Sequence, residues 1–458
     1  MNRSKGFYIT FVSATILLVS LLFLKILPYA PSPSGEGMGW MSINRYLPSI
    51  ETNQVSNWYS SLFMYECIGL KKLGSYVFDR EFSGMSILYG VWIGMTIMMF
   101  GSIIVLVYSA GMRGYWWLFA LPLCVFLSFS RVEDLFPINL DYNFVCLIWC
   151  LIAAMFTFSS SATRKWRLGN VVLLLLLLMH LIAYRRNFAV AVPFIMGWLF
   201  YMSDWFIQRR MWHKFAIWGM GTVALIFFSL TWVETVFLVQ KEHPLSPMME
   251  SDMRIAAILR GDVNPTVREG YQELKGELAE SSISAYWYKI QEDNWEMFRN
   301  LYVKEWKDHP ETMCAAGIIQ RIQFFSGGHS CQFLKRAVET IYPAVRENDK
   351  AWEIVAPTVS SFRERLFGLL MAPIGIVMGV IFMKRNLVVP EICSLVIITG
   401  SISTLYATSY LIVVPTSDAR YLAPAYMLSI FSIFTVVCAI LELAGRRMLA
   451  KLGLQKKM

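Results

Sequence analysis

Acidic residues stand beside long apolar segments of this chain, where charged side chains are costly and therefore informative. Glu133 and Asp134 are neighbours between two apolar runs, and Asp141 opens the second run. Adjacent carboxylates can act as a general base or hold a hard cation such as Mg²⁺ or Mn²⁺. Two neighbouring acids also occur by chance on solvated turns, so both interpretations stay open. Glu133 and Asp134 are candidate catalytic residues, and ligands of a divalent metal if one is bound, with Asp141 as a supporting residue.

Glu36 is a further candidate catalytic carboxylate. It lies in the glycine-rich stretch 34–39, just after a Pro-x-Pro segment at 31–33. Glycine lets the backbone adopt turns that bring a carboxylate and backbone amides close to a substrate. The same composition suits a flexible exit from a membrane-spanning segment, and the sequence supports both interpretations equally.

Three arginines adjoin the ends of apolar segments, namely Arg185 and Arg186 after one segment and Arg420 before another. The planar guanidinium fork suits phosphate or carboxylate, although such arginines can also extend to lipid headgroups. We expect them to form an anion site, with supporting side chains at Asn187, Asp418 and Tyr421. His180, inside the preceding apolar segment, is expected to be a hydrogen-bonded interior histidine rather than a proton relay.

The composition indicates that these residues belong to a membrane protein. Of 458 residues, 56% are hydrophobic and only 16% are charged, well below the share usual in soluble domains. A span needs about 20 apolar residues, and windows of that size predict an all-α polytopic protein with about ten transmembrane helices. The predicted spans are 7–28, 84–110, 115–130, 139–159, 168–184, 188–203, 215–235, 366–383, 388–412 and 421–444.

The placement of basic residues predicts the orientation of the spans. With the N-terminus in the cytoplasm, every predicted cytoplasmic loop is short and basic, as are both termini. The net charge of +9 is therefore a topology signal, and no nucleic-acid partner is expected. This orientation places Arg185, Arg186 and Arg420 on the outer side, where the charge rule disfavours them, and we infer that they bind an anionic ligand there. The expected location is a cell inner membrane, crossed many times.

The predicted spans divide the chain into three parts. Residues 1–235 form an N-terminal membrane domain with a first outer loop at 29–83, and residues 236–365 form a soluble, slightly acidic extracytoplasmic domain. Residues 366–458 form C-terminal membrane helices and a basic cytoplasmic tail. Within the first outer loop, residues 60–78 are apolar enough to be a re-entrant or interfacial helix.

The extracytoplasmic domain has a helical pattern. Aromatic and apolar residues recur at helical spacing from Ser281 to Lys307, and Pro310 then suits the first turn of another helix. Cys314 and Cys331 fall in this domain, where a disulfide between them and two free buried thiols are equally consistent with the sequence, since Cys67 is a third candidate partner.

The order of these parts resembles the GT-C class of integral-membrane glycosyltransferases, and within it the bacterial and phage-type enzymes that modify the O-antigen of lipopolysaccharide or other envelope glycans. The chain departs from the pattern in one respect, since the first-loop acid is usually aspartate and Glu36 is the acid nearest the expected place. The identity of the base stays open between Glu36 and the Glu133/Asp134 pair. The resemblance is carried by the stretches 180–187 leading into Val192 and Pro193, 247–256, 302–310 and 418–424.

The resemblance implies a polyprenyl-phosphate sugar donor and a glycan or lipid-linked acceptor, handled at the extracytoplasmic face in contact with membrane lipid. Arg185, Arg186 and Arg420 would meet the donor phosphate, while a carboxylate deprotonates the acceptor hydroxyl. The soluble domain would cover the cleft and select the acceptor. Two alternatives remain at this stage: an O-antigen polymerase or ligase, and a transporter of lipid-linked glycan.

Overall fold

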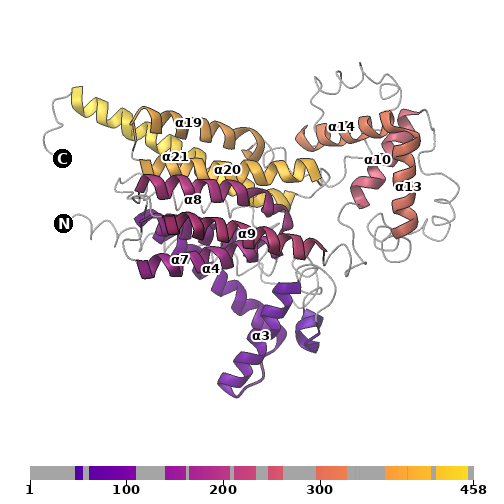
Figure 1. Cartoon of the computed structure of the whole chain (residues 1–458), viewed down its shortest axis with the longest axis horizontal. Helices are drawn as coiled ribbons and strands as arrows, with labels where there is room; N and C mark the ends of the chain where they lie inside the picture. The colour runs from indigo at the N-terminus through magenta and orange to yellow at the C-terminus, as the bar shows by residue number, and fades with distance from the viewer. Residues whose placement is uncertain are drawn as a thin grey trace, which may run out of the picture. The chain divides into compact units, whose positions relative to one another are not determined.

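A computed structural model of the chain describes part of the sequence, and this part is almost entirely helical with no β-strand (Figure 1). The chain forms two compact units, the first from Met1–Trp232, Phe367–Tyr406 and Ala423–Met458, the second from Val233–Leu366 and Ala407–Leu422. The described residues are 47–54, 61–109, 140–160, 164–206, 211–233, 246–260, 295–326, 367–388, 390–413 and 419–451, with the isolated positions 336 and 340.

Most described helices belong to the first unit. They are α3 (Ser61–Phe78), α4 (Gly84–Ser109), α6 (Leu140–Ser160), α7 (Arg164–Tyr184), the 3-10 helix η2 (Arg186–Ala191), α8 (Val192–Phe206), α9 (Met211–Val233), the π-helical turn η4 (Phe367–Met371), α19 (Ala372–Lys384), α20 (Pro390–Val413) and α21 (Ala419–Lys451). The end of α20 and the start of α21 fall in the second unit. The other helices of the second unit are α10 (Ser246–Leu259), α13 (Trp295–Asp308) and α14 (Pro310–Ser326).

Several described helices are apolar enough for a membrane protein. Three of them contain stretches long and apolar enough to cross a bilayer, at Gly84–Ile103, Pro390–Leu411 and Pro424–Gly445. Shorter apolar helices occur in α6, α7, α8, α9 and α19. The predicted spans at 7–28 and 115–130 lie outside the described residues, whereas the others each fall on a described helix. Crossing by ten helices stays a prediction.

Helix α6 forms the centre of the first unit. It packs between α4 and α7, and its side chains from Asn143 to Phe156 are buried except for the partly exposed Cys150. The Phe144 ring contacts Phe188 of η2 edge-on at 5.7 Å and Tyr406 of α20 at 5.3 Å. An apolar helix that is buried all round is expected only where other helices surround it, so α6 fixes the position of both α7 and η2.

The C-terminal helices pack closely through small residues. A Cβ at Gly400 would lie 2.8 Å from the Ile376 side chain and 3.1 Å from the carbonyl of Ala372, so α20 approaches α19 more closely than alanine would allow. The buried Ser403 hydroxyl donates to the Ala425 carbonyl of α21 over 2.6 Å. Small residues and hydroxyl-to-backbone bonds are the usual means of joining helices in an apolar medium.

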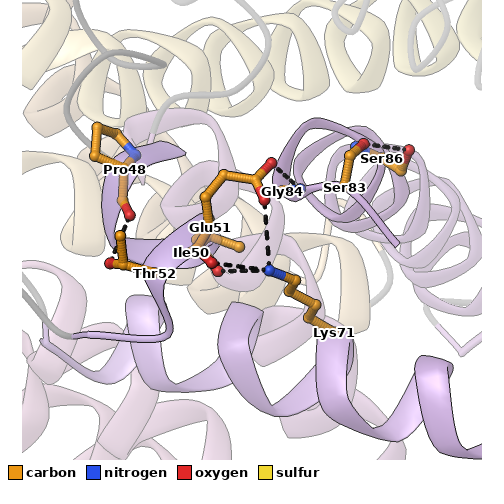
Figure 2. A network of polar contacts seen from close by, with 8 residues as sticks. All are labelled: Pro48, Ile50, Glu51, Thr52, Lys71, Ser83, Gly84 and Ser86. Atoms are coloured by element: carbon orange, nitrogen blue, oxygen red, sulfur yellow. Dashed lines mark hydrogen bonds and ion pairs between the residues drawn. The ribbon is translucent and has the colours of Figure 1, made fainter. Parts of the chain in front are cut away.

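A polar clamp joins α3 to the start of α4 (Figure 2). The buried Lys71 ammonium donates to the Ile50 and Glu51 carbonyls, at 3.1 and 3.2 Å, where the short helix 47–52 ends. Glu51 pairs with Lys71 at 3.4 Å, and its other carboxylate oxygen accepts from the Gly84 N–H over 2.6 Å. Cations suit helix C-termini and anions suit helix N-termini, so one ion pair stabilises two helix ends. The clamp fixes α3, which carries part of the candidate site.

The second unit contains the helix start that the sequence predicts. Helix α14 begins at Pro310, which confirms that expectation, and α13 covers the later part of the predicted helix from Ser281 to Lys307. The earlier part lies outside the described residues. Cys314 is an exposed free thiol on α14, and Cys331 lies outside the described residues.

Candidate functional site

The candidate site lies at the C-terminal end of α7, where the helix ends abruptly. Arg185 leaves the helix with an extended backbone, although its N–H still bonds the Leu181 carbonyl at 2.9 Å. Its own carbonyl accepts from the Phe188 N–H at 2.9 Å, which starts the 3-10 turn of η2. Pro193 follows in the first turn of α8, a position that needs no N–H. The buried Phe188 anchors this turn against α6, so its polar residues are held in place.

His180, one turn before the end of α7, forms two short polar contacts. Its Nδ1 lies 2.7 Å from the Leu176 carbonyl, and its Nε2 lies 2.6 Å from Glu66 Oε1 on α3. A carbonyl can only accept, so Nδ1 carries a hydrogen and donates it. The histidine is hydrogen-bonded as expected, but 33% of its side chain is exposed, so it is not the interior residue that the sequence predicted. The second ring nitrogen, Nε2, thus forms a short hydrogen bond with the Glu66 carboxyl group.

Tyr184 completes a three-residue network, the Glu66–His180–Tyr184 network. Its hydroxyl donates to Glu66 Oε2 over 2.6 Å. Tyr184 follows His180 by four residues, so both side chains lie on one face of α7 and reach the same carboxylate. The Phe63 ring, one turn before Glu66 on α3, meets the Tyr184 ring edge-on at 5.9 Å. The apolar contact and the two hydrogen bonds together fix Glu66 against α7.

The network is accessible to a ligand. Side-chain exposure is 29% for Glu66 and 33% for His180. Each carboxylate oxygen of Glu66 has one described partner and can accept a second hydrogen bond. A hydroxyl that approaches Glu66 therefore meets a proton acceptor already coupled to an imidazole, which is the arrangement that general-base chemistry needs.

The structure brings one group of predicted residues together. Arg185 is partly buried, and with Arg186 and Asn187 it forms a turn that directly follows the helix carrying His180 and Tyr184. The other predicted residues with a described backbone occupy the first turns of helices, Asp141 in α6 and both Arg420 and Tyr421 in α21. Four predicted residues lie outside the described residues: Glu36, Glu133, Asp134 and Asp418.

Comparisons of the chain with protein families, curated proteins and solved structures found no match. The function of the network has to be argued from its own geometry.

Glu66 is the residue that sequence reasoning missed. It lies 118 positions before Tyr184, and nothing in the spacing of the sequence pairs the two. A signal was present nevertheless, because Glu66 is the sole acidic residue between Ser61 and Phe78, a stretch otherwise apolar apart from two lysines. An isolated acid in an apolar segment marks a polar partner or a function.

The described residues hold no cluster suited to a metal. Among them, no group of three or more His, Cys, Asp and Glu side chains could bind an ion. The predicted Mg²⁺ or Mn²⁺ ligands, Glu133 and Asp134, lie outside the described residues.

A second carboxylate network lies in the second unit. Asp252 of α10 is buried, with an exposure of 3%, and accepts from Gln320 Nε2 of α14 at 2.8 Å and from the Tyr302 hydroxyl of α13 at 3.1 Å. Burial raises the pKa of Asp252 to about 7, although the Tyr302 hydrogen bond and the charge of Arg321 act in the opposite direction. This carboxylate joins three helices and has no open side.

An ion pair adds to the contacts between these helices. The Arg260 guanidinium, just after α10, lies 3.3 Å from the buried Glu305 carboxylate of α13 and 3.4 Å from the Thr312 hydroxyl of α14. Breaking a buried pair by removing one partner is strongly destabilising. These polar contacts therefore serve the packing of α10, α13 and α14.

Proposed function

We propose that the protein is a membrane glycosyltransferase that transfers a sugar from a polyprenyl-phosphate donor to a cell-envelope glycan such as O-antigen, at the extracytoplasmic face. One observation carries the proposal. The partly exposed Glu66–His180–Tyr184 network stands at the end of α7, and the turn with Arg185 and Arg186 follows it without a gap in the chain. A proton acceptor next to cationic side chains is what transfer from a phosphate-linked donor needs.

The chemistry can be written with these residues. The acceptor hydroxyl donates a hydrogen bond to Glu66, and its proton passes to the Glu66 carboxylate. The hydroxyl oxygen forms the new bond to the anomeric carbon, and the bond from that carbon to the phosphate oxygen breaks with its electron pair remaining on the phosphate. The guanidinium groups of Arg185 and Arg186 stabilise the phosphate that leaves. Tyr184 holds the carboxylate in position.

The charge pattern along α7 supports the extracytoplasmic location. The helix starts with Arg164, Lys165 and Arg167, and it ends with the network. Basic residues favour the cytoplasmic side, so the opposite end of α7 faces outward under this rule. Lipid-linked sugar donors expose their sugar at such a membrane surface.

Glu66 joins the earlier candidates and does not replace them. Glu36, Glu133 and Asp134 remain proposed bases, and Arg420 remains a proposed phosphate ligand with Asp418 and Tyr421 near it in the sequence. A divalent metal held by Glu133 and Asp134 would share the charge of the phosphate with the arginines.

The proposal is tested with the full chain in lipid nanodiscs. Polyprenyl-phosphate donors carrying different radiolabelled sugars are offered with envelope glycan from a strain in which the gene is deleted. We expect labelled glycan with one donor, and strong loss of transfer in Glu66→Gln but not in Glu81→Gln, an exposed carboxylate in the loop after α3. Glu36→Gln, Glu133→Gln and Asp134→Asn are tested in parallel. Unchanged transfer in all four candidate-base variants would exclude the carboxylate mechanism.

A further inference from the structure

Helix α3 has an apolar face that is exposed in the part of the chain that the structure describes. Tyr76 is 87% exposed, and other large apolar side chains are exposed on both sides of it along the helix. This set, called the α3 stripe below, consists of Tyr65, Leu70, Leu73, Tyr76 and Val77, with the exposed Lys72 beside them.

The opposite face of α3 is fully used by the protein. Its buried side chains are Phe63, Met64, Cys67 and Ile68, followed by Lys71 of the clamp. The helix is therefore already fixed by its inner face, and the α3 stripe contributes nothing to that packing. An exposed apolar face of this length on a fixed helix indicates contact with a partner.

The surroundings of α3 show which partner this is. Residues 79–83 alone separate α3 from α4, whose candidate span starts at Gly84, and the clamp bonds Glu51 to the Gly84 N–H. The C-terminal end of α3 therefore lies where a membrane-crossing segment begins. Helix α4 itself exposes Ile97 and other apolar side chains of the kind that face acyl chains. In Figure 1, α3 is steeply inclined to the direction of α7.

We propose that α3 lies along the membrane–water interface, with the α3 stripe inserted among the acyl chains of bilayer phospholipids. Leu70, Leu73 and Val77 follow Glu66 at helical intervals of four, three and four residues, so they continue the line of the network along the helix. Glu66 then lies at the level of the lipid headgroups and opens toward the bilayer surface. This gives a lipid-linked donor lateral access to Glu66, a consequence that rests on the proposed function, whereas the location of α3 does not.

Photo-crosslinking of the full chain in phospholipid nanodiscs tests the location. The photoreactive residue p-benzoylphenylalanine, which reacts with C–H bonds and not with water, is placed singly at Leu73 or Tyr76. Ile97 on the exposed face of α4 is the positive control, and Lys304 on the charged exposed face of α13 is the negative control. The substituted α3 positions are exposed, so folding is preserved, and gel filtration of each variant verifies it.

We expect phospholipid adducts at Leu73 and Tyr76 in yields similar to Ile97 and about tenfold above Lys304. Adducts at Ile97 with none at either α3 position would overturn the proposal. Crosslinks from Leu73 or Tyr76 to a second copy or to another segment of the chain would also overturn it, because protein would then cover the stripe. Sugar transfer is not measured, so this result stands apart from that of the transfer assay.

Discussion

The two units each contain a carboxylate held by a tyrosine, and the two differ in what surrounds them. Glu66 accepts from Tyr184 and faces His180, and 29% of its side chain is exposed. Asp252 accepts from Tyr302 and from the amide of Gln320, and only 3% of it is exposed. An imidazole exchanges protons near neutral pH, but an amide does not. The same tyrosine–carboxylate contact is therefore open to solvent beside an imidazole in the first unit, and it is closed within helix packing in the second.

The largest expected effect is a difference in sugar transfer between variants of the two carboxylates, Glu66 and Asp252. Glu66→Gln keeps the size of the side chain but removes the proton acceptor, so we expect sugar transfer to fall by about 10²–10⁴-fold. Asp252→Asn should leave transfer within about twofold, because its effect is confined to packing. Transfer rates in nanodiscs at equal amounts of folded protein give the comparison. Equal losses in both variants would show that the contrast between them is wrong.

Stability should show the reverse order. Asp252→Ala leaves the buried Gln320 amide and Tyr302 hydroxyl without this acceptor, so we expect the free energy of unfolding of the second unit to fall by about 2–4 kcal/mol. Glu66→Ala, at a partly exposed position, should cost about 1 kcal/mol. Hydrogen exchange of α10 and α14, and separately of α3 and α7, measures both. A larger loss at Glu66 than at Asp252 would contradict the assignment of packing to the second unit.

The second unit should lose stability as the pH rises from about 4 to about 7. Unfolded chain has the ordinary aspartate pKa of 3.8, whereas burial raises the pKa of Asp252 in the folded unit to about 7. Between these two pKa values the folded unit binds one proton more than the unfolded chain. The resulting contribution of Asp252 to the free energy of unfolding is complete below pH 3.8 and is lost as the pH rises past about 7. The slope is at most about 1.4 kcal/mol per pH unit. Hydrogen exchange of α10, corrected for the intrinsic rate at each pH, measures it.

Asp252→Asn is the matched control for the pH dependence. The amide has no charge to bury, so the slope between pH 4 and pH 7 should disappear while the α10 contacts remain. A slope that persists in this variant would assign the effect to another group.

The smallest expected effects come from the two tyrosines. Tyr184→Phe and Tyr302→Phe each remove one hydrogen bond to a carboxylate, which is worth about 1–2 kcal/mol of stability. Only Tyr184→Phe should also slow sugar transfer, because Glu66, the proposed acceptor of the hydroxyl proton, then loses the hydrogen bond that holds it in position. Hydrogen exchange and transfer rates of the same two preparations test this. A slower transfer in Tyr302→Phe would weaken the distinction between the units.

Local signals in the sequence predicted much of the fold. The helical class follows from apolar runs, and the start of α14 at Pro310 follows from the preference of proline for the first turn of a helix. The end of α7 next to Arg185 and Arg186 also agrees with the predicted span 168–184. Each of these features depends on residues close together in the chain.

Such local signals could not predict which residues meet in the site. Glu66 meets His180 and Tyr184 only because α3 packs on α7, and a contact over 118 positions leaves no trace in spacing. Asp252 belongs to a stretch that carries the glycosyltransferase resemblance, yet in the structure it is a buried contact between helices. Burial depends on tertiary packing, so a charged residue in a polar stretch gives no indication of it.

Labelling with a photoreactive polyprenyl phosphate tests the central claim most directly. The probe carries a diazirine beside its phosphate and is irradiated with the full chain in nanodiscs, after which labelled peptides are mapped. We expect label on α3 near Glu66 and on the turn with Arg185 and Arg186, removed by excess unlabelled polyprenyl phosphate. Label that is absent from both segments, or that the unlabelled lipid does not displace, would contradict the account.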